Sequence, residues 1–182
     1  TDGNLAAWLM DGTTQTSVAL TDPGGSGDPN WRVVGTGDFD NDGQVDLLFQ
    51  HTDGTLALWY MNGLKLVSAI LTDPPQPGGE WRAVGTGDFG LDGKTDIAFQ
   101  HTDGTLAVWF MNSSKLIQAA LMNPRNPGNA RWRVVSVADY DQDDQPDLLF
   151  QRSDEGTLAV WLMDGLSVEA VHFLDPANAG GP

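Results

Sequence analysis

The chain repeats itself about every fifty residues, and this repeat constrains the fold more than any other feature of the sequence. The motif WRVVGTGDFD begins at Trp31 and returns, slightly altered, at Trp81 and Trp132, with spacings of 50 and 51 residues. A second motif, TDGTLALWYMNG in its Thr52 copy, has related copies that begin at residues 1, 102 and 154. All seven tryptophans belong to these two motifs. A repeat of this length is typical of one supersecondary unit stacked several times.

Within each repeat, apolar residues alternate with polar ones or form short runs, which is typical of strands and not of helices. In the repeat that starts at Trp31, we expect strands at residues 31–39, 46–50, 55–61 and 64–71, with a tight turn at residues 53–54. Four antiparallel strands per repeat predict an all-β protein made of β-propeller blades. The large side chains of Trp59, Trp109 and Trp161 suit the faces on which neighbouring blades pack.

The chain holds about three and a half such repeats. We expect a half-blade with only the third and fourth strands at residues 1–30, and full blades at residues 31–80, 81–131 and 132–182, all within one propeller-type domain. Propeller rings usually have four to eight blades, so this number leaves blade surfaces uncovered. The sequence therefore predicts either a fragment of a longer propeller or copies that assemble as a homo-oligomer.

The charge balance limits the partners of this chain. It has 25 acidic residues against nine lysines and arginines, which gives a formal net charge of -16. Such an excess argues against binding nucleic acid, and the sequence has neither a basic cluster for anionic lipids nor an apolar run long enough for membrane insertion. The chain has no cysteine, so disulfides and thiolate metal sites are excluded.

Each Trp-Arg motif runs directly into a loop rich in aspartate. In the first loop, Asp38, Asp40, Asp42 and Asp46 stand at positions 1, 3, 5 and 9, and Gly43 at position 6 permits a sharp turn. Closely spaced carboxylates repel one another unless a cation lies among them, and hard oxygen ligands suit Ca²⁺. An EF-hand is excluded because its position-12 glutamate and flanking helices are missing. The alternative is a solvated acidic turn, since aspartate and glycine favour turns in any case.

The other two loops depart from this pattern. Gly90 replaces the position-3 carboxylate of the second loop, which predicts the weakest site, and Asp144 replaces the glycine of the third loop, which predicts a reduced affinity. Residues at position 7 contribute a backbone carbonyl. The predicted metal-site residues are Asp38, Asp40, Asp42, Gln44 and Asp46 in the first loop, Asp88, Asp92, Lys94 and Asp96 in the second, and Asp139, Asp141, Asp143, Gln145 and Asp147 in the third.

The segment DFDNDGQVD, followed by DLLFQ, resembles the calcium loop of the FG-GAP or VCBS-type repeat, which occurs in integrin α-subunit propellers and in many secreted bacterial proteins. The Trp-Arg motif, with the Gly-Gly before its second copy, also resembles fungal seven-bladed lectins that carry such loops. The resemblance covers essentially the whole chain. It implies calcium at the aspartate positions, on the hairpin between the first and second strands, while this fold hosts adhesion, lectin and enzyme functions alike.

We expect a ligand-binding surface on the face of the blades opposite the calcium hairpins. Aromatic rings beside hydrogen-bonding groups suit stacking on a sugar, and repeated weak sites suit avidity. The candidate ligand-binding residues on this face are Trp31, Arg32, His51, Asp53, Trp81, Arg82, His101, Asp103, Trp132, Arg133 and Arg152. The structural alternative is that each tryptophan is wedged between blades and each arginine of the motif pairs with a carboxylate of the neighbouring seam.

Catalysis normally needs a unique constellation of side chains, whereas nearly every polar residue here recurs with the repeat. His51 and His101 are equivalent, His172 stands alone, and no Ser-His-acid group or phosphate-binding loop is present. We therefore expect no enzyme. We expect a calcium-stabilised binding or adhesion module for a glycan or a protein, located outside the cell, where millimolar calcium matches weak sites. The alternatives are a self-assembling structural repeat protein that forms rings or filaments and, less favoured, a propeller-bearing polysaccharide lyase.

Overall fold

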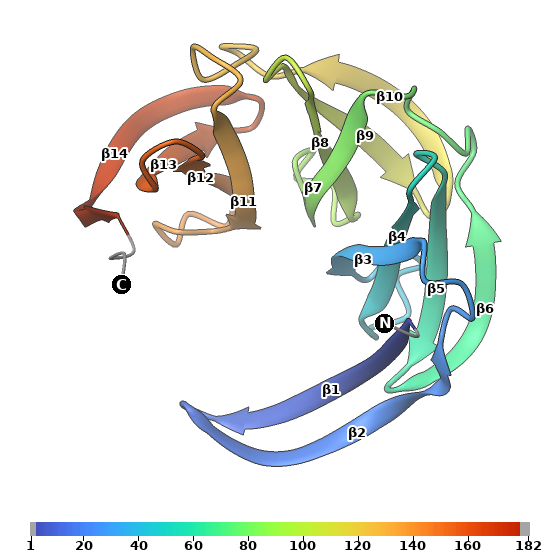
Figure 1. Ribbon diagram of the computed structural model, residues 1–182. Coiled ribbons are helices and arrows are strands. Elements are labelled where there is room, and N and C mark those ends of the chain that lie inside the picture. Colours follow the sequence, from blue (N-terminus) through green and yellow to red (C-terminus); the bar gives the residue numbers. More distant parts are fainter. Residues whose placement is uncertain (1–2, 179–182) are drawn as a thin grey trace.

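The protein is all-β in its computed structural model, which describes residues 3–178 and the side chains of residues 3–174 (Figure 1). The first two residues of the predicted half-blade and the last four of the predicted last blade therefore lie outside the described residues. The strands follow one another along the chain in antiparallel order within each unit. The predicted fold class is confirmed. None of the described residues forms a helix of the length and apolar character that crossing a membrane requires.

The strands group into a half-blade and three blades. The half-blade contains β1 (Asn4–Asp11) and β2 (Thr14–Gly25). The first blade contains β3 (Trp31–Gly37), β4 (Asp46–His51), β5 (Leu56–Asn62) and β6 (Lys65–Leu71). The second contains β7 (Trp81–Gly87), β8 (Asp96–His101), β9 (Leu106–Asn112) and β10 (Lys115–Leu121). The third contains β11 (Trp132–Ala138), β12 (Asp147–Arg152), β13 (Thr157–Asp164) and β14 (Ser167–Asn178).

The blades are arranged along an arc, with β3, β7 and β11 toward its centre and β6, β10 and β14 on its outer rim (Figure 1). Successive units are linked at the rim by one short parallel bridge each. Asp22 pairs with Lys65, Asp73 with Lys115, and Asn123 with Ser167. The bridge between β2 and β6 connects the half-blade and the first blade into one continuous sheet of six strands, although the two are separate repeat units.

The hydrophobic core lies between the blades because every strand has side chains on both faces. Leu48 and Leu58 of the first blade pack against Ile97 and Phe99 of the second, and all four are at most 1% exposed. The opposite face of the second blade packs in the same way against the third. The second blade is therefore the core partner of two neighbours, which explains why its strands are apolar on both faces.

The inner strands approach one another closely where the repeat carries glycine. A Cβ atom at Gly35 of β3 would lie 2.6 Å from Thr86 of β7, and one at Gly85 of β7 would lie 2.4 Å from Val137 of β11. The third blade has Ser136 at the equivalent position. Glycine is therefore required at this position wherever a following blade packs within the described chain.

Candidate calcium loops and inter-blade cavities

The first aspartate of each loop organises the backbone that follows it. The Asp38 carboxylate accepts hydrogen bonds from the amides of Asp42 (3.1 Å) and Gly43 (2.8 Å), and the Asp42 carboxylate accepts one from the amide of Gln44 (2.8 Å). These bonds bend the chain back before the expected end of the strand, so that β3 stops at Gly37 and not at residue 39.

The second and third loops have the same backbone bonds. In the second loop, the Asp88 carboxylate accepts hydrogen bonds from the amides of Asp92 (3.0 Å) and Gly93 (2.7 Å). In the third loop, the Asp139 carboxylate accepts them from the amides of Asp143 (3.2 Å) and Asp144 (3.0 Å). At position 6, Asp144 has a φ of +68°, close to the +84° of Gly43. An aspartate thus adopts the left-handed conformation that the sequence predicted for this position, at a cost of about 1–2 kcal/mol relative to glycine.

The position-9 aspartate of each loop is buried and bound to the backbone. The Asp46 side chain is fully buried, and its carboxylate accepts hydrogen bonds from the amides of Phe39 (2.9 Å) and Met61 (2.8 Å). Asp147 is equally buried and accepts from the equivalent amides of Tyr140 and Met163. Asp96 is also buried and accepts from the equivalent Met111 amide, but its loop donor is the amide of Gly90, one residue further along the chain. Each of these carboxylates joins its loop to the third strand of the blade, a structural role that the sequence did not reveal.

Burial affects the ionisation of these carboxyl groups. Loss of water around Asp46 raises its pKa above the usual range, although the two amides oppose this effect. Burial raises the pKa of Asp96 to about 6, again against the effect of its amide donors. The negative charges of neighbouring aspartates add to the increase in both cases. A cation in the loop would lower both pKa values and favour the ionised form.

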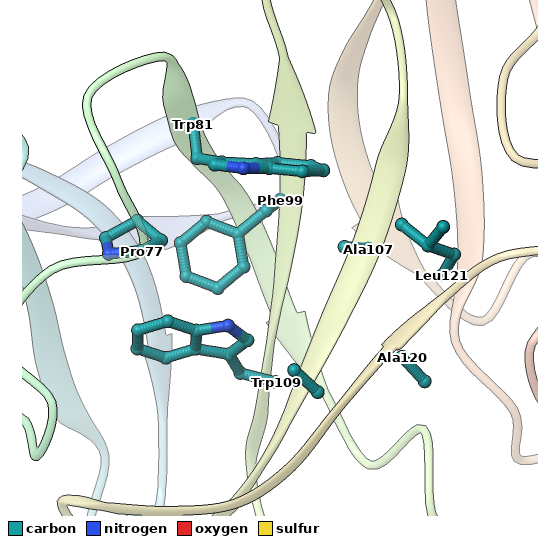
Figure 2. Close-up of a pocket in the computed structure, with 8 residues that line it drawn as sticks. Pro77, Trp81, Phe99, Ala107, Trp109, Ala120 and Leu121 are labelled. Carbon is teal, nitrogen blue, oxygen red and sulfur yellow. The ribbon is translucent and has the colours of Figure 1, made fainter.

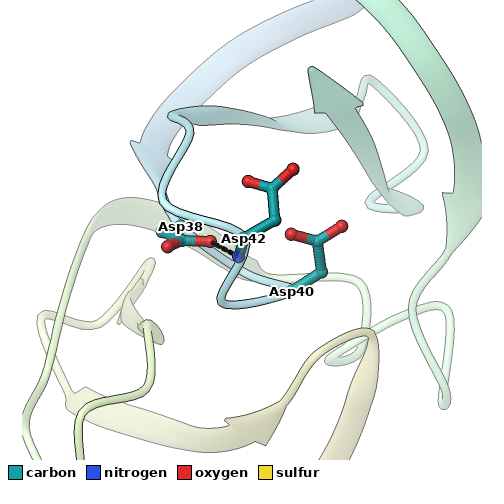
Figure 3. Close-up of side chains that lie close together, drawn as sticks. All are labelled: Asp38, Asp40 and Asp42. Atoms are coloured by element: carbon teal, nitrogen blue, oxygen red, sulfur yellow. Dashed lines mark hydrogen bonds between the residues drawn. The ribbon is translucent and has the colours of Figure 1, made fainter. Parts of the chain in front are cut away.

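The side chains of Asp38, Asp40 and Asp42 project from the same tight turn of the first loop (Figure 3). Their oxygens lie within 4.8 Å of one another, as do those of Asp139, Asp141 and Asp147 in the third loop. Two oxygens that bind the same Ca²⁺ at 2.3–2.6 Å are at most about 5 Å apart. The donor sets of the first and third loops therefore fit calcium. Partial desolvation, followed by the charges of the nearby aspartates, raises the pKa of Asp141, as expected where like charges converge.

The second loop differs in its charge. Gly90 supplies no side chain, and the Lys94 ammonium lies 2.7 Å from a carboxylate oxygen of Asp92. This contact lowers the pKa of Asp92 and raises that of Lys94. Among the described residues of this loop, no three carboxylates converge as in the other two. The sequence identified Lys94 only as a source of a backbone carbonyl, and it missed the contribution of the side chain.

On the opposite face, the predicted histidines and aspartates do lie beside the motif tryptophans. The His51 ring packs against Trp31 with a centroid distance of 5.0 Å, and its Nδ1 and Nε2 lie 2.9 Å from Asp53 and 3.5 Å from Asp28. His101 repeats this arrangement with Trp81, Asp103 and Glu80. In the last blade Arg152 replaces the histidine and pairs with Asp154 at 2.9 Å and with Glu155. The histidines thus join the turn after the second strand to the seam before the blade, and in the last blade Arg131 makes this connection by binding Asp154 at 2.9 Å.

The tryptophans and arginines of the Trp-Arg motif behave differently. Trp31, Trp81 and Trp132 are partly buried, which agrees with the structural alternative for these rings. Their neighbours Arg32, Arg82 and Arg133 are exposed, and none has a carboxylate within 4 Å among the described residues. The seam pairing considered for these arginines is therefore absent from the described part of the chain.

Two cavities of about 550 Å³ each lie along the inner strands. The first is lined by Arg32, His51, Thr52, Trp81 and Arg82, among others, and thus joins predicted ligand-binding residues of two blades. The second is lined by Arg82, Gln100, Thr102 and Arg133, among others. Arg82 lines both cavities.

Aromatic pockets lie on the other side of the motif tryptophans. In the second blade, the rings of Trp81, Phe99 and Trp109 flank a pocket of about 270 Å³, closed on its outer side by Leu121 and small alanines (Figure 2). The first blade has an equivalent pocket of about 240 Å³, lined by Trp31, Phe49, Ala57, Trp59, Ala69, Ile70 and Leu71, among others.

The third blade differs at this pocket. Phe173 occupies the position of Leu121, as shown by its pairing with the equivalent alanine of the neighbouring strand, and its ring lies 6.2 Å from Trp132. The sequence did not predict these pockets, and its only signal was the run of small residues on the fourth strand.

Successive four-stranded blades, each with an aspartate loop between its first and second strands, define a β-propeller-type repeat protein. The family model for the FG-GAP-like repeat matches residues 38–99 and 91–150, which together cover more than half of the chain, and the chain belongs to this family. The resemblance inferred from the loop sequence is thus confirmed. No curated protein matches the chain closely enough to count as a relative.

Proposed function

We propose that this protein is a calcium-stabilised, extracellular binding module that recognises saccharides and has no catalytic role. The convergence of three carboxylates in the first and third loops carries the calcium part of the proposal. Asp38, Asp40 and Asp42 would hold one ion, and Asp139, Asp141 and Asp147 another. A bound Ca²⁺ would neutralise the repelling carboxylates and stabilise the folded loops, and the millimolar calcium found outside cells suits such exposed sites.

The aromatic pockets support saccharide binding. Trp81 is only partly buried and lines the pocket beside small alanines, together with Trp109, which is 8% exposed. The apolar face of a pyranose stacks well on an accessible indole ring. The same pocket recurs in the first blade, so one branched or repetitive saccharide would engage two weak sites and gain avidity. A protein ligand with exposed aromatic or aliphatic side chains is the alternative occupant.

A substitution that copies the third blade tests this assignment. Leu121→Phe places in the second blade the ring that Phe173 supplies in the third, and it should fill the pocket between Trp81 and Trp109. Ile117→Phe, on the same strand, adds a ring at an exposed residue that does not line the pocket, and it is the matched control.

The measurement is a glycan-array screen in calcium, followed by titration of the best saccharide. We expect Leu121→Phe to weaken binding at least tenfold at the second blade and Ile117→Phe to leave it unchanged. Equal affinities of the two variants, or no saccharide bound by the unsubstituted chain, would contradict the proposal.

Self-assembly into rings or filaments is a second candidate function, favoured by the exposed apolar surface of the half-blade. Trp8 and Leu20 are each 64% exposed, and Leu9, Met10 and Val18 are also at least half exposed. Light scattering across a range of concentrations tests this candidate. A mass that rises with concentration, and that returns to one chain when Trp8 and Leu20 are replaced by lysine, is the expected result. A constant single-chain mass would exclude it.

A further inference from the structure

We propose that the two inner-strand cavities bind an oxyanion, a carboxylate or a sulfate, and that Arg82 is the contact they share. The choice of an acidic sugar as the carrier of this group rests on the saccharide binding proposed above. The arginine contact is distinct from the aromatic pocket of the second blade, because Arg82 does not line that pocket. Its neighbour on β7, Trp81, lines both that pocket and the first cavity.

The three motif arginines are equivalent in position and free of carboxylate partners. Arg32, Arg82 and Arg133 each pair in strand register with a glutamine, and all three are exposed. Of the six other lysines and arginines in the described chain, three have carboxylate partners: Arg131 and Arg152 both bind Asp154, and Lys94 binds Asp92. The remaining three do not line the two cavities. A row of unpaired guanidinium groups in a chain with a net charge of -16 marks a local reversal of charge.

The backbone on both sides of Arg82 is fixed by the preceding blade. The Gln50 side chain donates to the carbonyl of Trp81 (3.1 Å) and accepts from the amide of Ala83 (3.1 Å). Gln100 holds the segment around Arg133 in the same way, through the Trp132 carbonyl at 2.9 Å and the Val134 amide at 3.2 Å. Each of these two arginines therefore projects from a backbone segment clamped across a blade interface, which reduces the entropy lost when a ligand binds.

The lining of the cavities fits an acidic sugar better than a neutral one. A guanidinium group binds a carboxylate or a sulfate through two parallel hydrogen bonds, and the hydroxyl groups of Thr52 and Thr102 suit sugar hydroxyls. The carboxylates closest to His51, those of Asp28 and Asp53, are already in contact with that ring. Each cavity, at about 550 Å³, is large enough for a monosaccharide.

The strong net negative charge of the chain restricts the ligand further. It repels dense polyanions such as nucleic acid at long range, whereas a ligand with isolated charges experiences little of this repulsion. We therefore assign the cavities to saccharides that carry single uronate or sulfate groups among neutral sugars.

NMR titration of the full chain in calcium tests this assignment, with glucuronate, glucose 6-sulfate and neutral glucose as probes. The variant Arg82→Gln removes one positive charge from both cavities. The control Arg125→Gln removes the same charge from an exposed arginine outside them. Thermal unfolding of both variants confirms that each is folded before the titrations are compared.

We expect at least one acidic probe to bind tenfold or more tightly than glucose, Arg82→Gln to abolish this preference, and Arg125→Gln to change it less than twofold. A preference for glucuronate or for the sulfate also identifies the oxyanion. Equal binding of all three probes, or equal effects of the two substitutions, would overturn the proposal. The Leu121→Phe variant separates the two proposals. If it no longer binds neutral saccharides but still prefers the acidic probe to glucose, the arginine site is supported. If the unsubstituted chain binds neutral saccharides without preferring an acidic probe, the arginine site is overturned and the aromatic site is not.

Discussion

The first and second aspartate loops have nearly the same backbone and different side chains. In both, the position-1 aspartate accepts two loop amides, and the position-9 aspartate is buried against the third strand. They differ at position 3, where Asp40 is replaced by Gly90, and at position 7, where Gln44 is replaced by Lys94. The shape of the loop therefore depends on positions 1 and 9, whereas the negative charge gathered in the loop depends on positions 3 and 7.

The largest expected effect concerns the feature that the two loops share. Asp46→Ala leaves the buried amides of Phe39 and Met61 without an acceptor, and it should lower the free energy of unfolding by about 3 kcal/mol. Asp96→Ala should cost a similar amount in the second loop. Urea unfolding in excess chelator measures both, with exposed Asp40→Ala as the control. A tolerated Asp96→Ala would show that the second loop is not held in the same way.

The second-largest effect is expected when the position-3 carboxylate of the first loop, Asp40, is removed. Asp40→Gly gives it the position-3 residue of the second loop, and the calcium affinity of this site should fall at least tenfold because a converging carboxylate is lost. Stability in chelator should stay unchanged. Calorimetric calcium titration is the measurement, and Glu169→Gln, an exposed acidic residue on β14, is the charge-matched control. If both variants lost calcium affinity equally, the effect would come from the change in net charge and not from the lost carboxylate of Asp40.

The reverse exchange should create a site. In Gly90→Asp combined with Lys94→Gln, the new carboxylate joins Asp88 and Asp92, and the competing ammonium is removed. Gly90 does not have a positive φ, and a Cβ there would lie 3.4 Å from the Phe110 ring, so the aspartate fits with a small adjustment. The number of calcium ions that the chain binds with the affinity of the first loop should rise by one. An unchanged number would show that other features of the second loop prevent binding.

The smallest effect is expected for Lys94→Gln alone. The ion pair with Asp92 lies at the surface, where such pairs contribute little to stability. Melting temperatures in chelator should therefore be indistinguishable from those of the unsubstituted chain, while weak calcium binding at the second loop should improve slightly. A clear loss of stability would mean that the lysine replaces a cation as a structural element of this loop.

Local features of this molecule were predictable from the sequence, and contacts between distant segments were not. The repeat, the alternation of apolar residues and the offsets of Asp38, Asp40 and Asp42 are local, so the blades and loops followed from them. The bond from Asp46 to Met61 spans fifteen residues and depends on how the loop folds over the third strand. Nothing in the local sequence distinguishes such a buried carboxylate from an exposed ligand.

The ligand-binding face illustrates the same limit. The sequence predicts that His51 and Trp31 lie on the same face, because the turn after the second strand and the seam before the blade lie at the same end of the blade. The structure places the two rings in contact. The backbone around Arg82 is held by Gln50, a residue 32 positions earlier that reaches it only across a blade interface. The aromatic pockets depend on the fourth-strand register, which shifts at a bulge between Leu116 and Gln118. Each of these features requires knowledge of packing between strands.

Calcium titration of the chelator-treated chain, followed by calorimetry and by the melting temperature, tests the central claim most directly. The account predicts one calcium site in the first loop and a weaker one in the third, with a melting temperature that rises with calcium concentration. It also predicts that Asp40→Gly removes the first of these sites. A titration without binding heat and a melting temperature unchanged between calcium and chelator would contradict the account, and the loops would then be acidic turns shaped by their own aspartates.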